Sequence, residues 1–482
     1  MHVNWILVSA IYIIIVIAVC LRIVYDTRSS TKTIAYLLLS IFVPVGGILF
    51  YLVFGVNYWK LKLYSKKSAE GKKILDKLEQ EWEIPTGEFL KKSSNLLEGN
   101  YELAAMLLKE LHTPLTGGNK VKLLVNGEEK FPEVLKALNE AKHHIHLEYY
   151  IYENDSIGKQ IENILITKAK EGVQVKFIYD DFGSPSINKK MEIRLKNAGV
   201  EVYPFQKVLF YLLANRLNYR NHRKIIVIDG QTAFTGGINV SDKYINNKPG
   251  RLYWRDTHIR IDGPGVFYLQ YLFFTDWNFC CGKKIKPTIE HFVADKKFPE
   301  DTLLQVVASG PDADQPAILF SILQTINLAT KEILITTPYF IPGDAILDAL
   351  KVAALSGISV KLLVPGISDS KLVNAASSSY YGELLFAGVE IYLYNKGFVH
   401  AKTIVADGKL SVIGTANMDM RSFELNFEVN AIIYDEKISK KLRTIFFEDL
   451  RDAKKIDAKK WNKRPVYKQL PEKLARLFSP VM

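Results

Sequence analysis

The stretch "NHRKIIVIDG", residues 221–230, has an echo at residues 399–408, "VHAKTIVADG". Each copy holds a histidine, a lysine two positions on and an aspartate five positions further, and a Gly-x-x-Asn pair follows each aspartate. The matching positions are His222, Lys224, Asp229, Gly236 and Asn239 in the first copy, and His400, Lys402, Asp407, Gly414 and Asn417 in the second. Every pair is separated by the same offset (400 − 222 = 178). This constant spacing indicates an internal duplication, with the two halves packed face to face.

The segments around both copies alternate between apolar, β-rich runs and helical patterns. Strand-like runs lie at residues 120–125, 143–152, 173–181, 198–205, 332–340, 358–366 and 387–394. Helical patterns lie at residues 132–142, 156–171, 315–331 and 344–355. The alternation predicts an α/β fold made of two duplicated α-β-α domains related by a pseudo-twofold axis, with mixed or parallel sheets covered by helices.

Within each copy, the alternation of a strand separates the polar residues into two groups. His222 and Lys224 are two positions apart and should share one face of the strand, as should His400 and Lys402. Asp229 lies an odd number of residues from His222, in an Asp-Gly step that indicates a turn. We therefore expect both aspartates, the second being Asp407, to hold the turn rather than to take part directly in the chemistry.

Two such half-sites facing each other would form a catalytic centre with two imidazoles and two ammonium groups. One imidazole can attack while the other donates or accepts a proton. The lysines and the asparagine amides can surround an anion, and the glycines permit close approach of the backbone. This set of groups suits phosphoryl transfer on a phosphodiester and requires neither a metal nor a cofactor.

The N-terminal part of the chain predicts a membrane anchor. Residues 5–21 and 33–56 carry no charged side chain, and we expect two helices that form a transmembrane hairpin spanning residues 1–56. A basic connector (57–118) would follow, and then the two duplicated domains (119–295 and 296–482).

The distribution of basic residues predicts the orientation of this anchor. Three basic residues lie between the two apolar stretches, namely Arg22, Arg28 and Lys32. Seven follow the second stretch, namely Lys60, Lys62, Lys66, Lys67, Lys72, Lys73 and Lys77. This imbalance predicts a multi-pass membrane protein whose catalytic domains lie on the cytoplasmic side. The lysine cluster can bind anionic headgroups, or it can be a solvated face of the linker.

Composition agrees with a membrane surface and a reducing compartment. The formal net charge of +12 favours an anionic partner, either an acidic membrane surface or a nucleic acid. The three cysteines, Cys20, Cys280 and Cys281, have no spacing typical of a disulfide framework or a zinc site.

With both motifs in view, the chain resembles the phospholipase D superfamily, and within it the bacterial cardiolipin synthases. The resemblance extends over "PVGGILFYLVFG", "RNHRKIIVIDG", "FTGGINVSDKY", "YWRDTHIRIDGP", "ITTPYFIP" and "GTANMDMRSFELNFEVN". It implies that one phosphatidylglycerol forms a phosphatidyl-histidine intermediate, and that a second phosphatidylglycerol then accepts the phosphatidyl group. By this analogy His222 is the nucleophile and His400 the acid/base. The implied partners are phosphatidylglycerol and anionic lipids of the bacterial cell membrane, not nucleic acid.

The resemblance also implies roles for two carboxylates that follow the motifs. Asp256 in "YWRDTH" and Glu428 in "NFEVN" would each hydrogen-bond and orient an active-site histidine. The chain departs from the family pattern at the residue after the motif glycine, where many relatives have serine. Here the two positions are Gly237 and Thr415, so that only the second half retains a hydroxyl.

Several alternatives stay open at the level of sequence. The same histidines could transfer the lipid to water, as in a membrane-bound phosphodiesterase, or the chain could be a basic scaffold with an inactive site. His144, His146 and Glu148 share one strand face and could form part of a metal site, although a structural role is the more common outcome. An insertion at 206–217, present only in the first half, could contact the bilayer or pack on the domain as an ordinary amphipathic helix.

Overall fold

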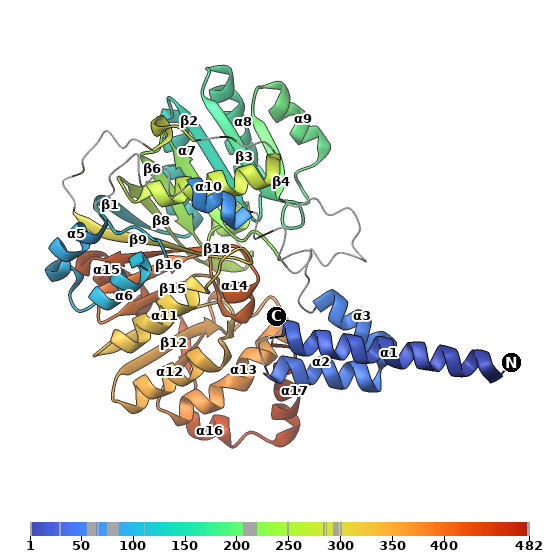
Figure 1. The fold of residues 1–482 in the computed structure, drawn as a ribbon. Helices are drawn as coiled ribbons and strands as arrows, with labels where there is room; N and C mark the ends of the chain where they lie inside the picture. The colour runs from blue at the N-terminus through green and yellow to red at the C-terminus, as the bar shows by residue number, and fades with distance from the viewer. Residues whose placement is uncertain are drawn as a thin grey trace. The chain divides into compact units, whose positions relative to one another are not determined.

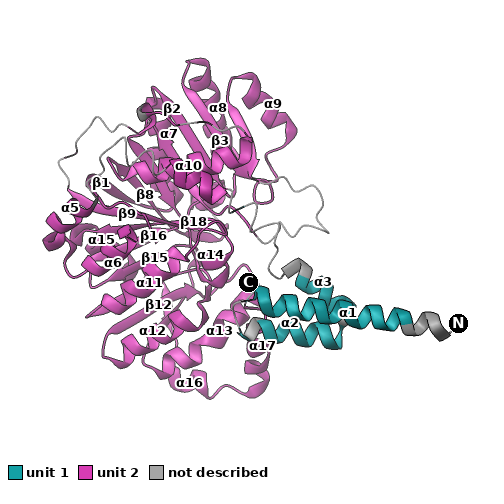
Figure 2. Cartoon of the chain, viewed as in Figure 1, with its two compact units in different colours: residues 1–66, 208–218 teal, residues 67–207, 219–482 magenta. Residues whose placement is uncertain are grey.

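A computed structural model describes residues 2–27, 30–54, 64, 67–74, 86–109, 111–205, 219–247, 250–282, 285, 287–292, 298 and 301–479. The chain divides into two compact units (Figure 2). The N-terminal unit comprises residues 1–66 and 208–218, and the larger unit, called the α/β unit, comprises residues 67–207 and 219–482. The predicted insertion at 206–217 lies outside the described residues.

The N-terminal unit contains one helix with the dimensions of a membrane span. Helix α1 (His2–Asp26) includes the apolar run Leu7–Asp26, the only one among the described residues that is long and apolar enough to cross a bilayer. Helices α2 (Ser30–Phe42) and α3 (Pro44–Phe54) have 13 and 11 residues. At 1.5 Å per residue they measure about 20 Å and about 17 Å, less than the ~30 Å hydrocarbon core.

The single second helix predicted over residues 33–56 is therefore wrong, because the chain folds back on itself after residue 42. The ring of Tyr36 in α2 lies 5.5 Å from that of Tyr51 in α3, and a Cβ at Gly47 would lie 2.3 Å from the carbonyl oxygen of Leu39. Pro44 has no N–H to continue the helix, and Gly47 lets the two backbones approach closely. Both features are visible in the sequence within an otherwise continuous apolar run.

The α/β unit is built on one mixed sheet in which the two halves have matching strand orders. Read outward from the central β1–β9 pair, the first half runs β1 (Thr116–Val125), β8 (Thr257–Asp262), β6 (Thr232–Gly236), β5 (Lys224–Ile228), β2 (His144–Tyr149), β3 (Gln174–Asp180) and β4 (Glu201–Phe205). The second half runs β9 (Thr302–Ser309), β18 (Glu428–Tyr434), β16 (Leu410–Gly414), β15 (Thr403–Ala406), β10 (Glu332–Thr336), β12 (Ser359–Pro365), β13 (Glu390–Tyr394) and β19 (Ala453–Lys455). Except for the extra β19, each strand of one half has its counterpart in the other.

Helices cover both faces of each half (Figure 1). On one face pack α7 (Asn126–Glu140), α8 (Ser156–Lys170) and α9 (Lys189–Asn197) in the first half, and α11 (Ala317–Leu328), α12 (Gly343–Leu355) and α13 (Lys371–Phe386) in the second. On the other face pack α10 (Val266–Cys281) and α15 (Glu436–Arg451). The predicted α/β class and helix-covered sheets are confirmed.

A third buried cluster joins the two halves. It contains strand residues of the first half, such as Ile225 and Ile259, together with strand residues of the second, such as Val405 and Val429. The halves therefore share a core as well as the antiparallel β1–β9 pair at the centre of the sheet. Burying apolar side chains from both halves in one cluster makes the two copies of the duplication a single compact unit.

Short elements complete the unit. They are α5 (Thr86–Lys92), α6 (Tyr101–Lys109), β7 (Tyr253–Arg255), β11 (Phe340–Ile341), β14 (Gly397–Val399), β17 (Met418–Asp419), α14 (Met420–Glu424), α16 (Ala458–Asn462) and α17 (Val466–Arg476), with 3-10 turns at Ser94–Leu97, Asp242–Tyr244 and Ile289–His291. Within the predicted connector, residues 67–74, 86–92 and 101–109 are helical, and residues 116–118 already belong to β1. Two of these short strands, β7 and β14, contribute directly to the candidate site.

Candidate active site

Each motif histidine is held by the backbone of the opposite half. His222 lies just before β5, and its N–H donates to the carbonyl oxygen of Phe427 at 2.9 Å. In the same way the N–H of His400 donates to the carbonyl oxygen of Arg255 at 2.7 Å, where β14 pairs with β7. These exchanged backbone contacts bring the two motifs together, although 178 residues separate them (400 − 222).

The carboxylate that faces each imidazole also comes from the opposite half of the chain. Nδ1 of His222 lies 3.0 Å from Oε1 of Glu428, and Nδ1 of His400 lies 2.7 Å from Oδ2 of Asp256. Both carboxylate side chains are fully buried. A carboxylate that accepts from Nδ1 fixes the imidazole tautomer and leaves Nε2 as the reactive nitrogen.

The two motif lysines are buried beside the histidines. Nζ of Lys224 donates to the carbonyl oxygen of His222 at 2.7 Å, and Nζ of Lys402 donates to that of His400 at 2.5 Å. Burial lowers the pKa of Lys224 to about 8 and that of Lys402 to about 7. An ammonium has three donors, so each lysine can also bind a phosphate oxygen.

The free site holds His400 as neutral imidazole. Burial, together with the charge of Lys402, lowers the pKa of His400 to about 3 in spite of the Asp256 carboxylate. A bound anionic phosphate would favour the protonated imidazole. His400 can therefore gain its proton as substrate binds.

The residues that follow the motif glycines explain the departure from the family pattern. A Cβ at Gly237 would lie 2.0 Å from Oδ1 of Asp256, so glycine makes room for that carboxylate. In the second half the Thr415 hydroxyl donates to Oε2 of Glu428 at 2.5 Å and accepts from the N–H of Val429 at 2.9 Å. The hydroxyl thus supports the carboxylate that faces His222.

The glycines and asparagines of the two Gly-x-x-Asn pairs have structural contacts. Gly236 has a φ of +139°, and a Cβ at Gly414 would lie 2.0 Å from Oδ1 of Asn430. The amide of Asn239 accepts from the N–H of Ile151 and donates to the Tyr244 hydroxyl. Oδ1 of Asn417 is buried and has no hydrogen-bond partner among the described residues. Both polar atoms of the Asn239 amide thus bond to residues of the protein, Ile151 and Tyr244.

The structure places both motif aspartates away from the imidazoles, at the far ends of their strands. Asp229 has a φ of +53°, and its carboxylate accepts from the backbone N–H groups of residues 142–144. Asp407 has a φ of +54° and accepts from the N–H groups of residues 330–332. Each carboxylate therefore fixes the start of the neighbouring strand, β2 or β10.

A buried ionic network behind His222 was not predicted from the sequence. The guanidinium of Arg223 contacts Asp276 at 2.5 Å, and Lys67 forms an ion pair with Asp276 at 2.8 Å. Nearby, burial and the Asp276 charge raise the pKa of Glu148 well above its usual range, and Glu148 accepts from the side chain of Asn221. Arg223 is visible inside the motif, but its partners come from distant segments that no local pattern identifies.

Aromatic side chains form part of the walls around the imidazoles. The ring of Tyr150 lies 4.1 Å from that of His222. On the other side the rings of Trp254 and Phe398 lie 5.5 Å and 5.8 Å from that of His400. These residues were also missed, because aromatic residues on strands are most often part of a core.

The possible metal triplet is engaged in hydrogen bonds within the protein. The amide of Gln270 bridges the two rings, with Oε1 3.1 Å from Nε2 of His144 and Nε2 2.8 Å from Nδ1 of His146. Burial lowers the pKa of His144 to about 3 and that of His146 well below its usual range, so both rings are neutral. Among the described residues, no group of three or more His, Cys, Asp or Glu side chains could hold a metal ion.

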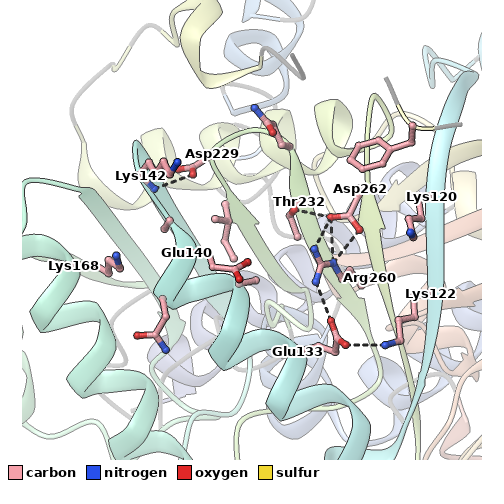
Figure 3. Close-up of a pocket in the computed structure, with 16 residues that line it drawn as sticks. Lys120, Lys122, Glu133, Glu140, Lys142, Lys168, Asp229, Thr232, Arg260 and Asp262 are labelled. Carbon is pink, nitrogen blue, oxygen red and sulfur yellow. Dashed lines mark hydrogen bonds and ion pairs between the residues drawn. The ribbon is translucent and has the colours of Figure 1, made fainter. Parts of the chain in front are cut away.

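A separate pocket of about 910 Å³ lies at the turn end of β5 and β6, away from the histidines (Figure 3). Its polar lining residues are largely paired with one another. Arg260 bridges Asp262 and Glu133, and Glu133 also accepts from Lys122. Of the predicted site residues, Asp229 alone lines this pocket.

Comparison with known proteins agrees with this geometry. The family profile described as "Cardiolipin synthase, PLD-like domain" matches residues 134–249 and 322–450, and "Phospholipase_D-nuclease N-terminal" matches residues 10–55. A cardiolipin synthase of Alkalihalophilus pseudofirmus is 42% identical over 98% of this chain and 93% of its own. The major cardiolipin synthase ClsA of Bacillus subtilis is 39% identical over 100% of both chains.

A solved structure shows the same fold at low sequence identity. The phosphatidylserine synthase of Haemophilus influenzae superposes with a TM-score of 0.58 at 13% identity, and the alignment covers 75% of this chain and 95% of that one. With two exchanged histidine sites and relatives aligned over its whole length, the chain belongs to the cardiolipin synthase family of phospholipase D-like proteins.

Proposed function

We propose that this chain is a membrane-bound cardiolipin synthase, which transfers the phosphatidyl group of one phosphatidylglycerol to a second and releases glycerol. The observation that carries the proposal is the exchanged pairing of two histidines with two buried carboxylates, His222 with Glu428 and His400 with Asp256. Two oriented imidazoles supply the nucleophile and the proton carrier that a two-step phosphoryl transfer needs.

In the first step, Nε2 of His222 attacks the phosphorus of the donor lipid. The bond from phosphorus to the headgroup glycerol oxygen breaks, and protonated His400 gives its proton to that oxygen. In the second step, His400 takes the proton from a hydroxyl of the acceptor phosphatidylglycerol, whose oxygen attacks phosphorus. The phosphorus–nitrogen bond then breaks and His222 is regenerated.

Lys224 and Lys402 would stabilise the charge that develops on the phosphoryl oxygens. Both ammonium groups are buried next to the histidines, where an electrostatic interaction is stronger than in water. The matching strand orders and the constant offset support a pseudo-twofold relation between the two half-sites. Such symmetry leaves the choice of nucleophile to family analogy, which assigns it to His222.

The proposed location is the bacterial cell membrane, with the α/β unit on the cytoplasmic side. The lysine-rich stretch after residue 56 supports this side. The fold of α2 and α3 favours one membrane crossing over the two that were predicted. The Tyr51 hydroxyl, near the end of α3, donates to Asp26 at the end of α1. The α2–α3 pair thus begins and ends near the same end of α1. We propose that α1 alone crosses the bilayer.

The test is to supply purified protein with phosphatidylglycerol as the only lipid. Cardiolipin and glycerol are the expected products, and phosphatidic acid with glycerol would instead identify a hydrolase. Acid quenching during turnover should trap a phosphatidyl adduct on His222, and His400→Ala should slow turnover by about 10²–10⁴-fold. An adduct on His400 would reverse the two assigned roles.

A further inference from the structure

Three arginines next to the catalytic residues are almost fully buried, and they differ in their hydrogen bonding. Arg220, Arg223 and Arg255 are 2%, 2% and 3% exposed. Arg223 donates to Asp276 and to backbone carbonyls, and Arg255 donates to Asp449, Thr257 and a backbone carbonyl. By contrast, Nε, Nη1 and Nη2 of Arg220 have no hydrogen-bond partner among the described residues. A buried guanidinium with no hydrogen bond is costly and requires an explanation.

The nearest carboxylate does not supply the missing hydrogen bonds. Nη1 of Arg220 lies 3.9 Å from Oδ1 of Asp180, beyond hydrogen-bond distance. Both oxygens of Asp180 accept from backbone N–H groups, Oδ1 from Phe182 and Gly183 and Oδ2 from Asn221. The guanidinium stacks on the ring of Phe182 at 4.4 Å, which holds its plane without using its donors. Its fork of N–H donors is therefore left for another anion.

This guanidinium lies beside the catalytic centre. Arg220 precedes His222 by two residues. Burial raises the pKa of the Tyr150 hydroxyl, and the charge of Arg220 opposes this increase. The ring of Tyr150 lies 4.1 Å from the His222 imidazole. The charge of Arg421 also opposes the increase in the pKa of Tyr150, and it adds to the effect of burial in lowering the pKa of Arg220. A second cation is therefore close by. The side of the site next to His222 thus holds two arginines as well as the carboxylates of Asp180 and Glu428.

The equivalent position in the other half carries no charge. Adding the offset of the duplication to residue 220 gives residue 398 (220 + 178), which is Phe398. Its ring packs at 4.9 Å against Trp254 and at 5.8 Å against His400. The two sides of an otherwise duplicated site therefore differ at this position. The His222 side has a guanidinium with no hydrogen bond among the described residues, and the His400 side has an apolar ring, with the ammonium of Lys243 lying 4.4 Å from the centre of the Trp254 ring.

We propose that Arg220, with Arg421 nearby, is a second phosphate subsite that binds the phosphate of the acceptor phosphatidylglycerol. The inference rests on the proposed function, because cardiolipin contains two phosphates joined through one glycerol. The lysines and histidines hold the phosphate that is transferred, so the acceptor's own phosphate needs separate donors. A guanidinium matches two phosphate oxygens at once, which an ammonium does not.

Such a subsite would explain why a lipid accepts the phosphatidyl group instead of water. Water and glycerol carry no phosphate and gain nothing from Arg220. A phosphatidylglycerol held by its phosphate places its hydroxyl near the intermediate, which favours transfer through proximity. Arg220 is thus a specificity-determining residue of the second step.

The test compares Arg220→Gln with wild-type protein in two reactions. Exchange of labelled glycerol into phosphatidylglycerol uses only the transferred phosphate, so the variant should retain most of this activity. Cardiolipin formation also uses the acceptor phosphate and should fall by about 10–100-fold, the effect of losing a charged hydrogen bond. The ratio of phosphatidic acid to cardiolipin should rise accordingly.

Two soluble acceptors separate the phosphate from the acyl chains. Wild-type protein should use glycerol phosphate at lower concentration than glycerol, and Arg220→Gln should lose this preference, with partial recovery in Arg220→Lys. Arg260→Gln, which removes an ion-paired arginine from the same half, should change neither reaction. An equal loss of exchange and of cardiolipin formation in Arg220→Gln would overturn the subsite. Wild-type protein that makes no cardiolipin would instead overturn the proposed function.

Discussion

At each motif histidine, the carboxylate that faces the imidazole comes from the half of the chain that does not carry that histidine. Glu428 faces His222, and Asp256 faces His400. Neither half alone therefore holds an oriented imidazole. The two copies differ at the residue after the motif glycine because each contacts a different carboxylate. Gly237 makes room for Asp256, and the Thr415 hydroxyl donates to Glu428.

The buried lysines predict how catalysis depends on pH. A lysine is charged below its pKa, and burial places the pKa of Lys402 at about 7 and that of Lys224 at about 8. As the pH rises through these values the free site loses positive charge and its affinity for an anionic lipid. We expect kcat/KM to fall as the pH is raised from about 6 to about 9, since this parameter reports the free enzyme.

Lys402→Arg provides the matched control for this pH profile. The guanidinium stays charged over the whole range, so the falling limb should move to higher pH even if the rate is lower. Initial rates in mixed micelles of phosphatidylglycerol and detergent provide the measurement. A falling limb at the same pH in both proteins would show that the limb has another origin.

At the scale of elements, the Asp-Gly turns connect neighbouring strands within each half of the sheet through hydrogen bonds. Asp229 joins the end of β5 to the start of β2, and Asp407 joins the end of β15 to the start of β10. Both are non-glycine residues with positive φ, a conformation that aspartate and asparagine tolerate better than other residues. The two motif aspartates thus stabilise the pairing of these strands. The histidines lie at the other ends of the same chain segments.

We expect Asp229→Ala to lower the free energy of unfolding by about 1–3 kcal/mol, because the backbone N–H groups of residues 142–144 lose their charged acceptor. Asp229→Asn keeps an acceptor and tolerates the positive φ, so its loss should be smaller. Thermal unfolding in detergent and activity per folded molecule provide the measurements. A large loss of activity at unchanged stability would show that Asp229 acts in the chemistry.

At the scale of the whole molecule, the fold of the N-terminal unit determines which side of the membrane each terminus occupies. A single crossing by α1 places residues 22–32 and the lysines after α3 on one side, so all these basic residues satisfy the positive-inside tendency. The predicted two-helix hairpin would instead leave three of them outside. The two topologies differ in the location of the N-terminus.

A cysteine at position 3 distinguishes these topologies in a protein whose native cysteines are replaced by serine. With α1 as the single span, Val3→Cys should react with a membrane-impermeant maleimide on intact cells. The exposed residue Lys463, changed to cysteine, should react only after the cells are permeabilised. Protection of position 3 until permeabilisation would support the hairpin instead.

The amino-acid sequence by itself determined the duplication, the α/β class, the two His-Lys pairs and the supporting position of the aspartates. Each of these depends on local periodicity or on a constant offset, and both can be read along the chain. The family resemblance added the two carboxylates, Asp256 and Glu428, but not which histidine each one faces.

Only the tertiary structure decided the exchange of carboxylates between halves, the buried ionic network behind His222 and the Arg220 guanidinium that has no hydrogen bond among the described residues. These features depend on contacts between segments far apart in sequence, and a side chain's type does not reveal whether it finds a partner. The fold-back of α3 on α2 was likewise decided by the tertiary structure, because Pro44 and Gly47 permit a break in the apolar run but do not require one.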